Sequence, residues 1–203
     1  MTFTGMPLDI FLALAAFATV TAFTPGPNNI MVTASGVNFG FTRTLPHILG
    51  ITLGFVVLLL GCAAGLGAIF AAYPPLQIVL KVAGALYMLW LAWKVATSAP
   101  SSAEPDEVAR PLSFWQAALF QWVNPKAVVI ALSAIAIYVR PANWRVDLAV
   151  LLVVFGVTTI LAVATWTGFG VALRRVLNDP KRARIFNIVM AVLLVVSIVP
   201  MVI

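Results

Sequence analysis

The chain alternates long apolar segments with short polar connections. A membrane-spanning helix needs about 20 apolar residues, and six segments qualify: 8–34, 46–71, 74–97, 113–138, 147–172 and 185–203. The one long polar connection is Ser98–Arg110, which carries Glu104, Asp106 and Glu107. The pattern predicts an all-α polytopic membrane protein with a single transmembrane domain over residues 1–203. A linker over residues 98–112 would join two three-helix halves, 1–97 and 113–203.

Two of these segments are interrupted by proline. The first contains Thr24-Pro25-Gly26-Pro27-Asn28-Asn29, and the fourth contains Gln121-Trp122-Val123-Asn124-Pro125-Lys126. Proline has no N–H and clashes with the carbonyl four residues back, so each run breaks its helix. Gly26 permits unusual backbone angles, while Asn124 is expected to cap and Pro125 to open a new half-helix. Both breaks should lie near the middle of the bilayer, where we expect them to meet.

The two breaks occupy matching positions in the two halves. An odd number of spans per half inverts the second half relative to the first. Interrupted helices at corresponding positions of inverted halves indicate the binding site of a secondary transporter. The candidate substrate-binding residues are therefore those of the two breaks: Thr24, Pro25, Gly26, Pro27, Asn28, Asn29, Asn124, Pro125 and Lys126.

Lys126 is the one charge well inside a predicted span. A lysine at the centre of a span costs about 2.5–3.5 kcal/mol on insertion scales, so it needs a reason. In the first turn after the break, it adds positive charge to a half-helix N-terminus, which suits a carboxylate. The carbonyls of Thr21 and Phe23, freed by the prolines, can accept from an ammonium. Together these groups predict a site for a zwitterionic amino acid.

Each of these side chains also has a structural interpretation. Lys126 can instead extend to the inner interface, and Asn28 and Asn29 can satisfy freed backbone groups rather than line a cavity. Gln121 and Trp122 can contact substrate or pack. The glycines at 50, 54, 61 and 65 are spaced to share one helical face. This face favours close packing within the chain, with a homo-oligomer interface as the alternative.

The charges predict how the chain is oriented. The net charge of +6 does not indicate nucleic-acid binding, because the basic residues fall mostly between apolar segments. They concentrate in the first, third and fifth connections, at Arg43, Lys94, Arg110 and within 174–184. Cytoplasmic loops carry the excess of lysine and arginine. These connections are therefore expected in the cytoplasm and both termini outside.

Other function classes find little support in the residues. Cys62 is the only cysteine and His47 the only histidine, so a metal site or metal cofactor is not expected, and a cation carrier lacks buried ligands. A serine nucleophile would have only His47 as a conventional base, which argues against an enzyme. His47 itself can be interfacial or can titrate in a proton pathway.

The motifs, taken in order, resemble those of the LysE/RhtB family of amino-acid exporters. They are Thr24-Pro25-Gly26-Pro27-Asn28, the run Gly40 to Gly50-x-x-x-Gly54, Lys81-x-Ala83-Gly84-x-x-Tyr87-x-x-Trp90, and Asn124-Pro125-Lys126. The resemblance covers essentially the whole chain. It implies a bacterial inner-membrane antiporter with six hydrophobic segments. Such a protein exports amino acids or close derivatives by using the proton motive force, with the bilayer and protons as partners.

One departure narrows the expected substrate. The stretch 127–132 after the second break is wholly apolar, and no Asp or Glu lies deep in any predicted span. A substrate with a charged side chain would leave that charge unpaired, so neutral amino acids are expected, and the proton-carrying residue is not identified. The alternative is a transporter of another small metabolite or cation on the same scaffold.

Overall fold

The computed structural model describes residues 2–3, 5–98, 110–174, 176–177 and 179–199. Nearly all of this part is helical, which confirms the all-α membrane class. The helices are α1 (Leu8–Phe23), α2 (Pro27–Phe39), α3 (Phe41–Gly61), α4 (Gly67–Ala72), α5 (Pro74–Ala96), α6 (Phe114–Val123), α7 (Pro125–Tyr138), α8 (Trp144–Arg174) and α9 (Pro180–Val196). A π-helical stretch, Cys62–Leu66, links α3 to α4, and a 3-10 turn, Pro141–Asn143, precedes α8. Ahead of α1, β1 (Thr2–Phe3) pairs antiparallel with β2 (Met6–Pro7).

The helices correspond to the predicted spans, but fewer than six of them meet the length and hydropathy expected of a membrane-spanning helix. Among the described residues, three helices are long and apolar enough to cross a membrane, and five spans result if each bent pair counts as one. The bends are 53° between α1 and α2 and 67° between α6 and α7. The predicted span 185–203 corresponds to α9, whose 17 residues are fewer than the about 20 that a span needs. The six-span layout therefore stays a prediction, and most of the predicted linker, 99–109, lies outside the described residues.

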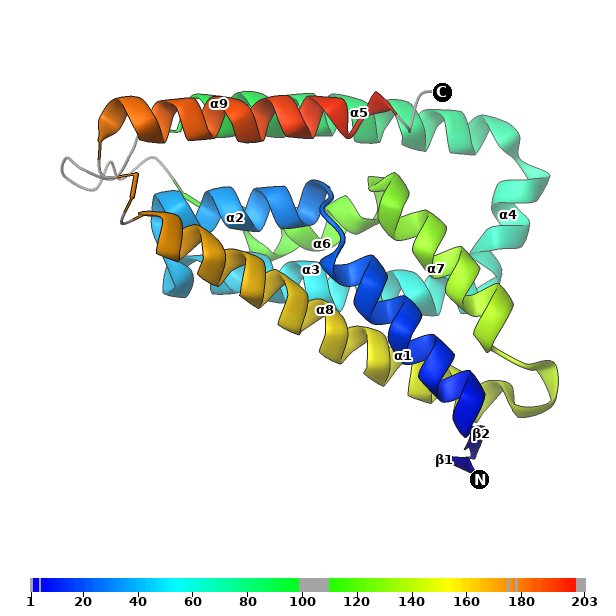
Figure 1. The fold of residues 1–203 in the computed structure, drawn as a ribbon. Coiled ribbons are helices and arrows are strands. Elements are labelled where there is room, and N and C mark those ends of the chain that lie inside the picture. Colours follow the sequence, from blue (N-terminus) through cyan, green and yellow to red (C-terminus); the bar gives the residue numbers. More distant parts are fainter. Residues whose placement is uncertain (1, 4, 99–109, 175, 178, 200–203) are drawn as a thin grey trace.

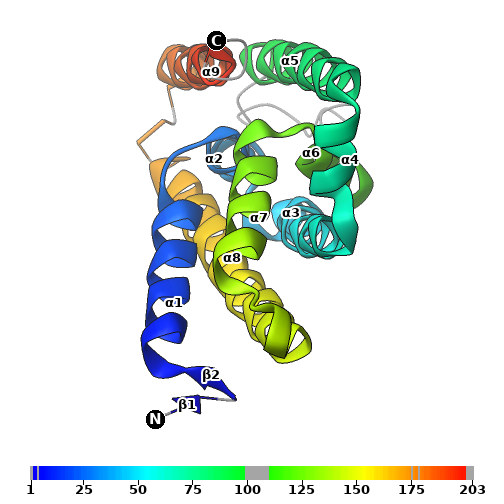
Figure 2. The same cartoon turned by 90° about the vertical axis from the view of Figure 1, so that its right-hand side faces the viewer.

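The connections alternate between two ends of the molecule. The α2–α3 turn and the α8–α9 connection lie at one end, and the N-terminus, the α7–α8 connection and the end of α9 lie toward the other (Figure 1). Helices α5 and α9 lie side by side as a layer over the remaining helices (Figure 2). The Asn187 side chain in the middle of α9 donates to the Ser98 carbonyl beyond α5, at 3.0 Å. This arrangement matches the expected alternation of loops, whereas the side that faces the cytoplasm stays a prediction.

Two helix pairs pack with their backbones in contact, because glycines lie at the crossings. A Cβ on Gly36 would overlap the Thr167 carbonyl, and one on Gly170 would overlap the Thr33 carbonyl, so α2 and α8 meet reciprocally. Gly50 in the same way abuts the Phe114 carbonyl of α6. A Cβ on the next glycine of that face, at position 54, would lie 2.5 Å from the Ala118 Cα. The expected close packing within the chain is thus observed.

Gly65 does not belong to that packing face. Its φ is +107°, and a Cβ there would meet nothing within 4 Å. Only glycine adopts this backbone conformation without strain, so the residue marks a break at the π-helical stretch Cys62–Leu66 rather than a packing contact. The prediction of one continuous helix over 46–71 with four glycines on one face is therefore wrong at its end. The segment consists of α3 and the short α4.

A buried ion pair joins the α7–α8 connection to the start of α8. Arg140 donates from Nε and Nη2 to the Asp147 carboxylate, each at 2.7 Å, and from its backbone N–H at 3.0 Å. The Asp147 side chain is fully buried, whereas Arg140 remains 30% exposed. This is the only salt bridge among the residues that the structure describes. It fixes the direction in which the chain enters α8.

Candidate functional site

The first break ends α1 and starts α2 without a helical turn between them. Gly26 is extended, with φ −170° and ψ −179°, and Pro27 opens α2. Any residue adopts this backbone conformation, so the unusual angles that glycine permits are not used here. A Cβ at Gly26 would lie 2.9 Å from Lys126 Cδ and 3.1 Å from its Nζ, so the end of the flexible lysine side chain would have to shift. The lysine stem packs directly over the first break.

Side chains cap the carbonyls that the first break leaves free. Asn29 Nδ2 donates to the carbonyls of Ala22, at 2.9 Å, and Thr24, at 3.0 Å. Trp166 Nε1 of α8 donates to the Phe23 carbonyl at 3.3 Å. The expectation that the Phe23 carbonyl is free to accept a substrate ammonium is therefore not met in this conformation. Asn29 plays both of its expected roles, because it also lines the cavity described below.

The second break positions Asn124 and Pro125 at the start of α7. Pro125 is the first residue of the half-helix, as predicted, and Asn124 occupies the N-cap position. The Asn124 side chain makes no capping hydrogen bond, which corrects the expected role. It is 1% exposed, and its Oδ1 has no hydrogen-bond partner. A buried acceptor without a partner is costly, so this oxygen is available to a donor from a ligand.

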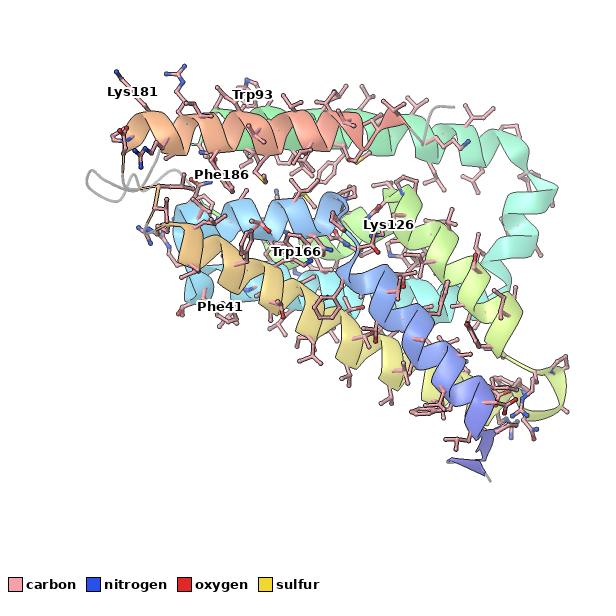
Figure 3. The ribbon with its side chains drawn as sticks, viewed as in Figure 1. Phe41, Trp93, Lys126, Trp166, Lys181 and Phe186 are labelled. Carbon is pink, nitrogen blue, oxygen red and sulfur yellow. The ribbon has the colours of Figure 1, made fainter. Side chains whose placement is uncertain are left out.

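Two polar contacts connect the breaks to each other. Lys126 Nζ donates to the Thr24 carbonyl at 2.5 Å, so the lysine crosses to the first break instead of extending to the interface (Figure 3). Asn28 and Gln121 form a reciprocal amide pair, with N···O distances of 2.8 and 3.2 Å. Gln121 is fully buried and also donates to the Ala117 carbonyl at 2.9 Å. From the sequence, Gln121 was expected either to contact substrate or to pack. In the structure it pairs with Asn28 of the first break.

A cavity of about 60 Å³ lies where the two breaks meet; we call it the central cavity. Six of the nine candidate residues line it: Gly26, Pro27, Asn28, Asn29, Asn124 and Lys126. Pro25 and Pro125 are not among the lining residues, and Thr24 takes part through its carbonyl. Pro25 and Pro125 break the helices and so bring the polar side chains into place, whereas Pro27 also lines the cavity. The predicted substrate contacts of these prolines stay a prediction.

The rest of the lining is mostly apolar and, apart from Thr21, was not predicted. Phe55 of α3 and Phe155 of α8 meet edge to face, with ring centroids 5.6 Å apart, and both line the cavity. The other lining residues are Thr21, Ala22, Ile51, Ala127, Ile130, Thr159, Ala162 and Val163. An apolar residue inside an apolar span gives no signal of its own. Thr159, a buried polar residue in a span, is the one member that composition could have indicated.

The comparisons with known proteins agree with this architecture. The chain matches the family described as LysE type translocator over residues 19–200. The chain belongs to this family. A cysteine/O-acetylserine efflux protein of Escherichia coli (strain K12) is 36% identical over 195 residues, which cover 94% of this chain and 96% of that protein. The protein of the same name from Shigella flexneri serotype 5b (strain 8401) is 36% identical over 192 residues, or 91% of this chain and 94% of that protein. No solved structure matches the chain.

As a LysE type translocator, the chain is a multi-pass membrane transporter and not an enzyme. Two half-helices, α2 and α7, begin at the central cavity, and the positive ends of their dipoles lie there with Lys126. Helix N-termini with unpaired N–H groups favour anions. Among the described lining residues there is no Asp or Glu. No group of three or more His, Cys, Asp or Glu that could hold a metal ion occurs among the described residues. Two positive helix ends and an ammonium beside an apolar wall are chemically suited to an anionic group.

Proposed function

We propose that this translocator exports small neutral amino acids or their close derivatives from the cytoplasm across a bacterial inner membrane. The printed function of the relatives, cysteine and O-acetylserine efflux, supports this substrate class. Both compounds are small amino acids without a charged side chain. The proposal rests chiefly on one observation: two half-helix N-termini and Lys126 converge on a cavity whose remaining wall is mostly apolar.

The substrate carboxylate is assigned to Lys126 and the open N–H groups at the starts of α2 and α7. A hydrogen bond to a charged group contributes about 1.5–3 kcal/mol, and the helix ends add favourable dipoles. Lys126 must exchange its contact with the Thr24 carbonyl for the carboxylate. That exchange vacates one acceptor position of the Thr24 carbonyl for the substrate ammonium, while Asn29 Nδ2 keeps the other.

The rest of the substrate is assigned to the opposite wall. The Asn124 Oδ1, which has no partner, can accept from the ammonium together with the Thr24 carbonyl. The side chain would then lie against Phe55 and Phe155. A lysine or arginine substrate would bring a second positive charge into the cavity beside Lys126. The described lining residues include no carboxylate that could pair with that charge. The cavity thus favours neutral side chains.

Energy coupling and orientation follow from the family resemblance and the charge pattern. We infer proton antiport, with the α2–α3 and α8–α9 connections in the cytoplasm because Arg43, Lys181, Arg182 and Arg184 lie in or beside them. Both termini would then face the periplasm. The two halves, 1–97 and 113–203, are proposed as inverted repeats, a view supported by the bent helix pair in each.

Release of a mixed amino-acid pool from proteoliposomes under an imposed pH gradient tests the proposal directly, with the products identified by mass spectrometry. Lys126→Ala should reduce release roughly 10- to 100-fold, since a charge-assisted hydrogen bond of about 1.5–3 kcal/mol is lost. Lys81→Ala is the matched control, because Lys81 is an exposed lysine of α5 that lines neither the central cavity nor the second cavity described below.

The outcomes separate the parts of the proposal. Release of cysteine and similar neutral species that is lost with Lys126→Ala and with an uncoupler supports both the substrate class and the coupling. Release of lysine in preference to leucine and threonine would refute the neutral-substrate assignment. Wild-type rates in Lys126→Ala would refute the carboxylate role of Lys126.

A further inference from the structure

A second cavity lies along α2, nearer to the α2–α3 turn than the central cavity is. It has a volume of about 40 Å³ and is bounded by α2, the start of α3, the last turn of α5 and residues 110–112. The two cavities follow each other along the same helices. On α2, Asn28 lines the central cavity and Ser35 the second one. On α3, Ile51 lines the central cavity and His47, one turn or about 6 Å away, lines the second.

His47 is the most informative residue of the second cavity. It is fully buried, its Nδ1 lies 3.3 Å from Ser35 Oγ, and its Nε2 has no hydrogen-bond partner in the described part of the chain. With the Ser35 hydroxyl donating to Nδ1, the proton of the neutral ring sits on Nε2. The ring then holds an N–H donor without an acceptor, and a buried donor of this kind costs about 1–3 kcal/mol unless a ligand satisfies it.

The remaining polar lining is cationic. Lys94 and Arg110 border the cavity, and the described lining contains no Asp or Glu. The Lys94 Nζ lies 5.1 Å from the Trp90 ring centroid and makes no ion pair within the described residues. Asn38 cannot serve a ligand freely, because its amide pairs with Asn187 at 3.1 and 3.3 Å. In the tautomer with the proton on Nε2, one unpaired N–H and two cations border a cavity whose described lining has no carboxylate, which suits a small oxyanion.

We propose that the second cavity is a loading site, in which His47, Lys94 and Arg110 bind the carboxylate of the amino acid before it reaches the central cavity. The occupant is a soluble amino acid, because the second cavity and the central cavity are lined by successive stretches of α2 and α3. This step rests on the proposed export function. It adds a second carboxylate site to the path and places it at the end of the protein from which substrate would load.

His47 is the only histidine of the chain, so it serves as its own spectroscopic probe. Protein labelled with 15N-histidine, purified without a histidine tag and placed in phosphatidylcholine nanodiscs, gives one imidazole in long-range 1H–15N spectra. Titration with sodium acetate should shift the Nε2 signal saturably, whereas sodium chloride at equal ionic strength and methylamine should not. Lys94→Gln should weaken the apparent acetate affinity roughly tenfold, because one charge-assisted hydrogen bond is removed.

Three comparisons decide the proposal. In Lys126→Ala the acetate-induced shift should persist while export is lost, which separates the loading site from the central cavity. An unchanged His47 signal throughout the titration, with Lys126→Ala still inactive in export, would overturn the loading site and leave the proposed function standing. A shift produced by phosphatidylglycerol in the nanodisc without acetate would overturn the assignment as well, because the oxyanion would then come from a lipid headgroup.

Discussion

Gly170 and Gly168 lie two residues apart on α8 and offer a matched test of the backbone contact between α2 and α8. A Cβ on Gly170 would overlap the Thr33 carbonyl oxygen and lie 3.0 Å from the carbonyl carbon. A Cβ on Gly168 would meet nothing within 4 Å. The same substitution, glycine to alanine, therefore adds a methyl group to a tight crossing in one variant and to open space in the other.

The expected effects follow from two contributions. Alanine is favoured over glycine in a helix by about 0.8–1.0 kcal/mol, and both variants gain this. Gly170→Ala also forces α2 and α8 apart, and overpacking of this kind costs about 1–3 kcal/mol. Gly168→Ala should thus be stabilised, and Gly170→Ala should unfold more readily than Gly168→Ala by about 1–3 kcal/mol.

The free energy of unfolding can be measured by sodium dodecyl sulfate titration of the protein in mixed micelles, with circular dichroism as the signal. Gly36→Ala, whose Cβ would overlap the Thr167 carbonyl, should behave like Gly170→Ala. The double variant should cost less than the sum of the two, because one separation of the helices relieves both overlaps. Equal stability of Gly170→Ala and Gly168→Ala would refute the reasoning.

Three further experiments test other features by the same unfolding assay. Asp147→Asn should lower the free energy of unfolding by about 1.5–3 kcal/mol, because the Arg140 guanidinium loses a charged acceptor; an unchanged value would mean that the pair contributes nothing net. Gly65→Ala should cost about 1–2 kcal/mol from backbone strain alone, since φ is +107° and the new methyl meets nothing; a gain in stability would contradict that conformation. A double-mutant cycle of Asn28→Ala and Gln121→Ala should give a coupling energy of about 0.6–1.7 kcal/mol, and a coupling near zero would refute the amide pair.

The polar part of the site could be predicted because proline acts locally. Pro27 and Pro125 each dictate a break whatever surrounds them, and Lys126 is conspicuous as a charge in an apolar run. The apolar wall could not be predicted, because Phe55 and Phe155 resemble every other apolar residue until the helices pack. The Asn28–Gln121 pair joins residues 93 positions apart, and only tertiary structure selects it.

The break at Gly65 was missed for a different reason. A glycine at position 65 is compatible with close helix packing, because of its spacing from the other glycines, and equally with a positive φ. The sequence alone does not distinguish these two roles. Spacing alone correctly predicted that Gly50 contacts a neighbouring helix closely. The sequence thus predicts where helices break and where they approach one another closely. It does not predict which apolar side chains line the cavity between them.

A carrier that exposes its site to each side of the membrane in turn has to change shape. The backbone contacts at the glycine crossings limit which helices can move relative to one another. Interlocked backbones do not slide past one another without losing their packing, so we expect α2 to travel with α8, and α3 with α6. Each pair takes one helix from either side of the linker. The moving bodies would then be α1, α2 and α8 against α3, α6 and α7. The central cavity lies between these bodies. Two hydrogen-bonded contacts, Lys126–Thr24 and Asn28–Gln121, join the bodies across the cavity in this conformation.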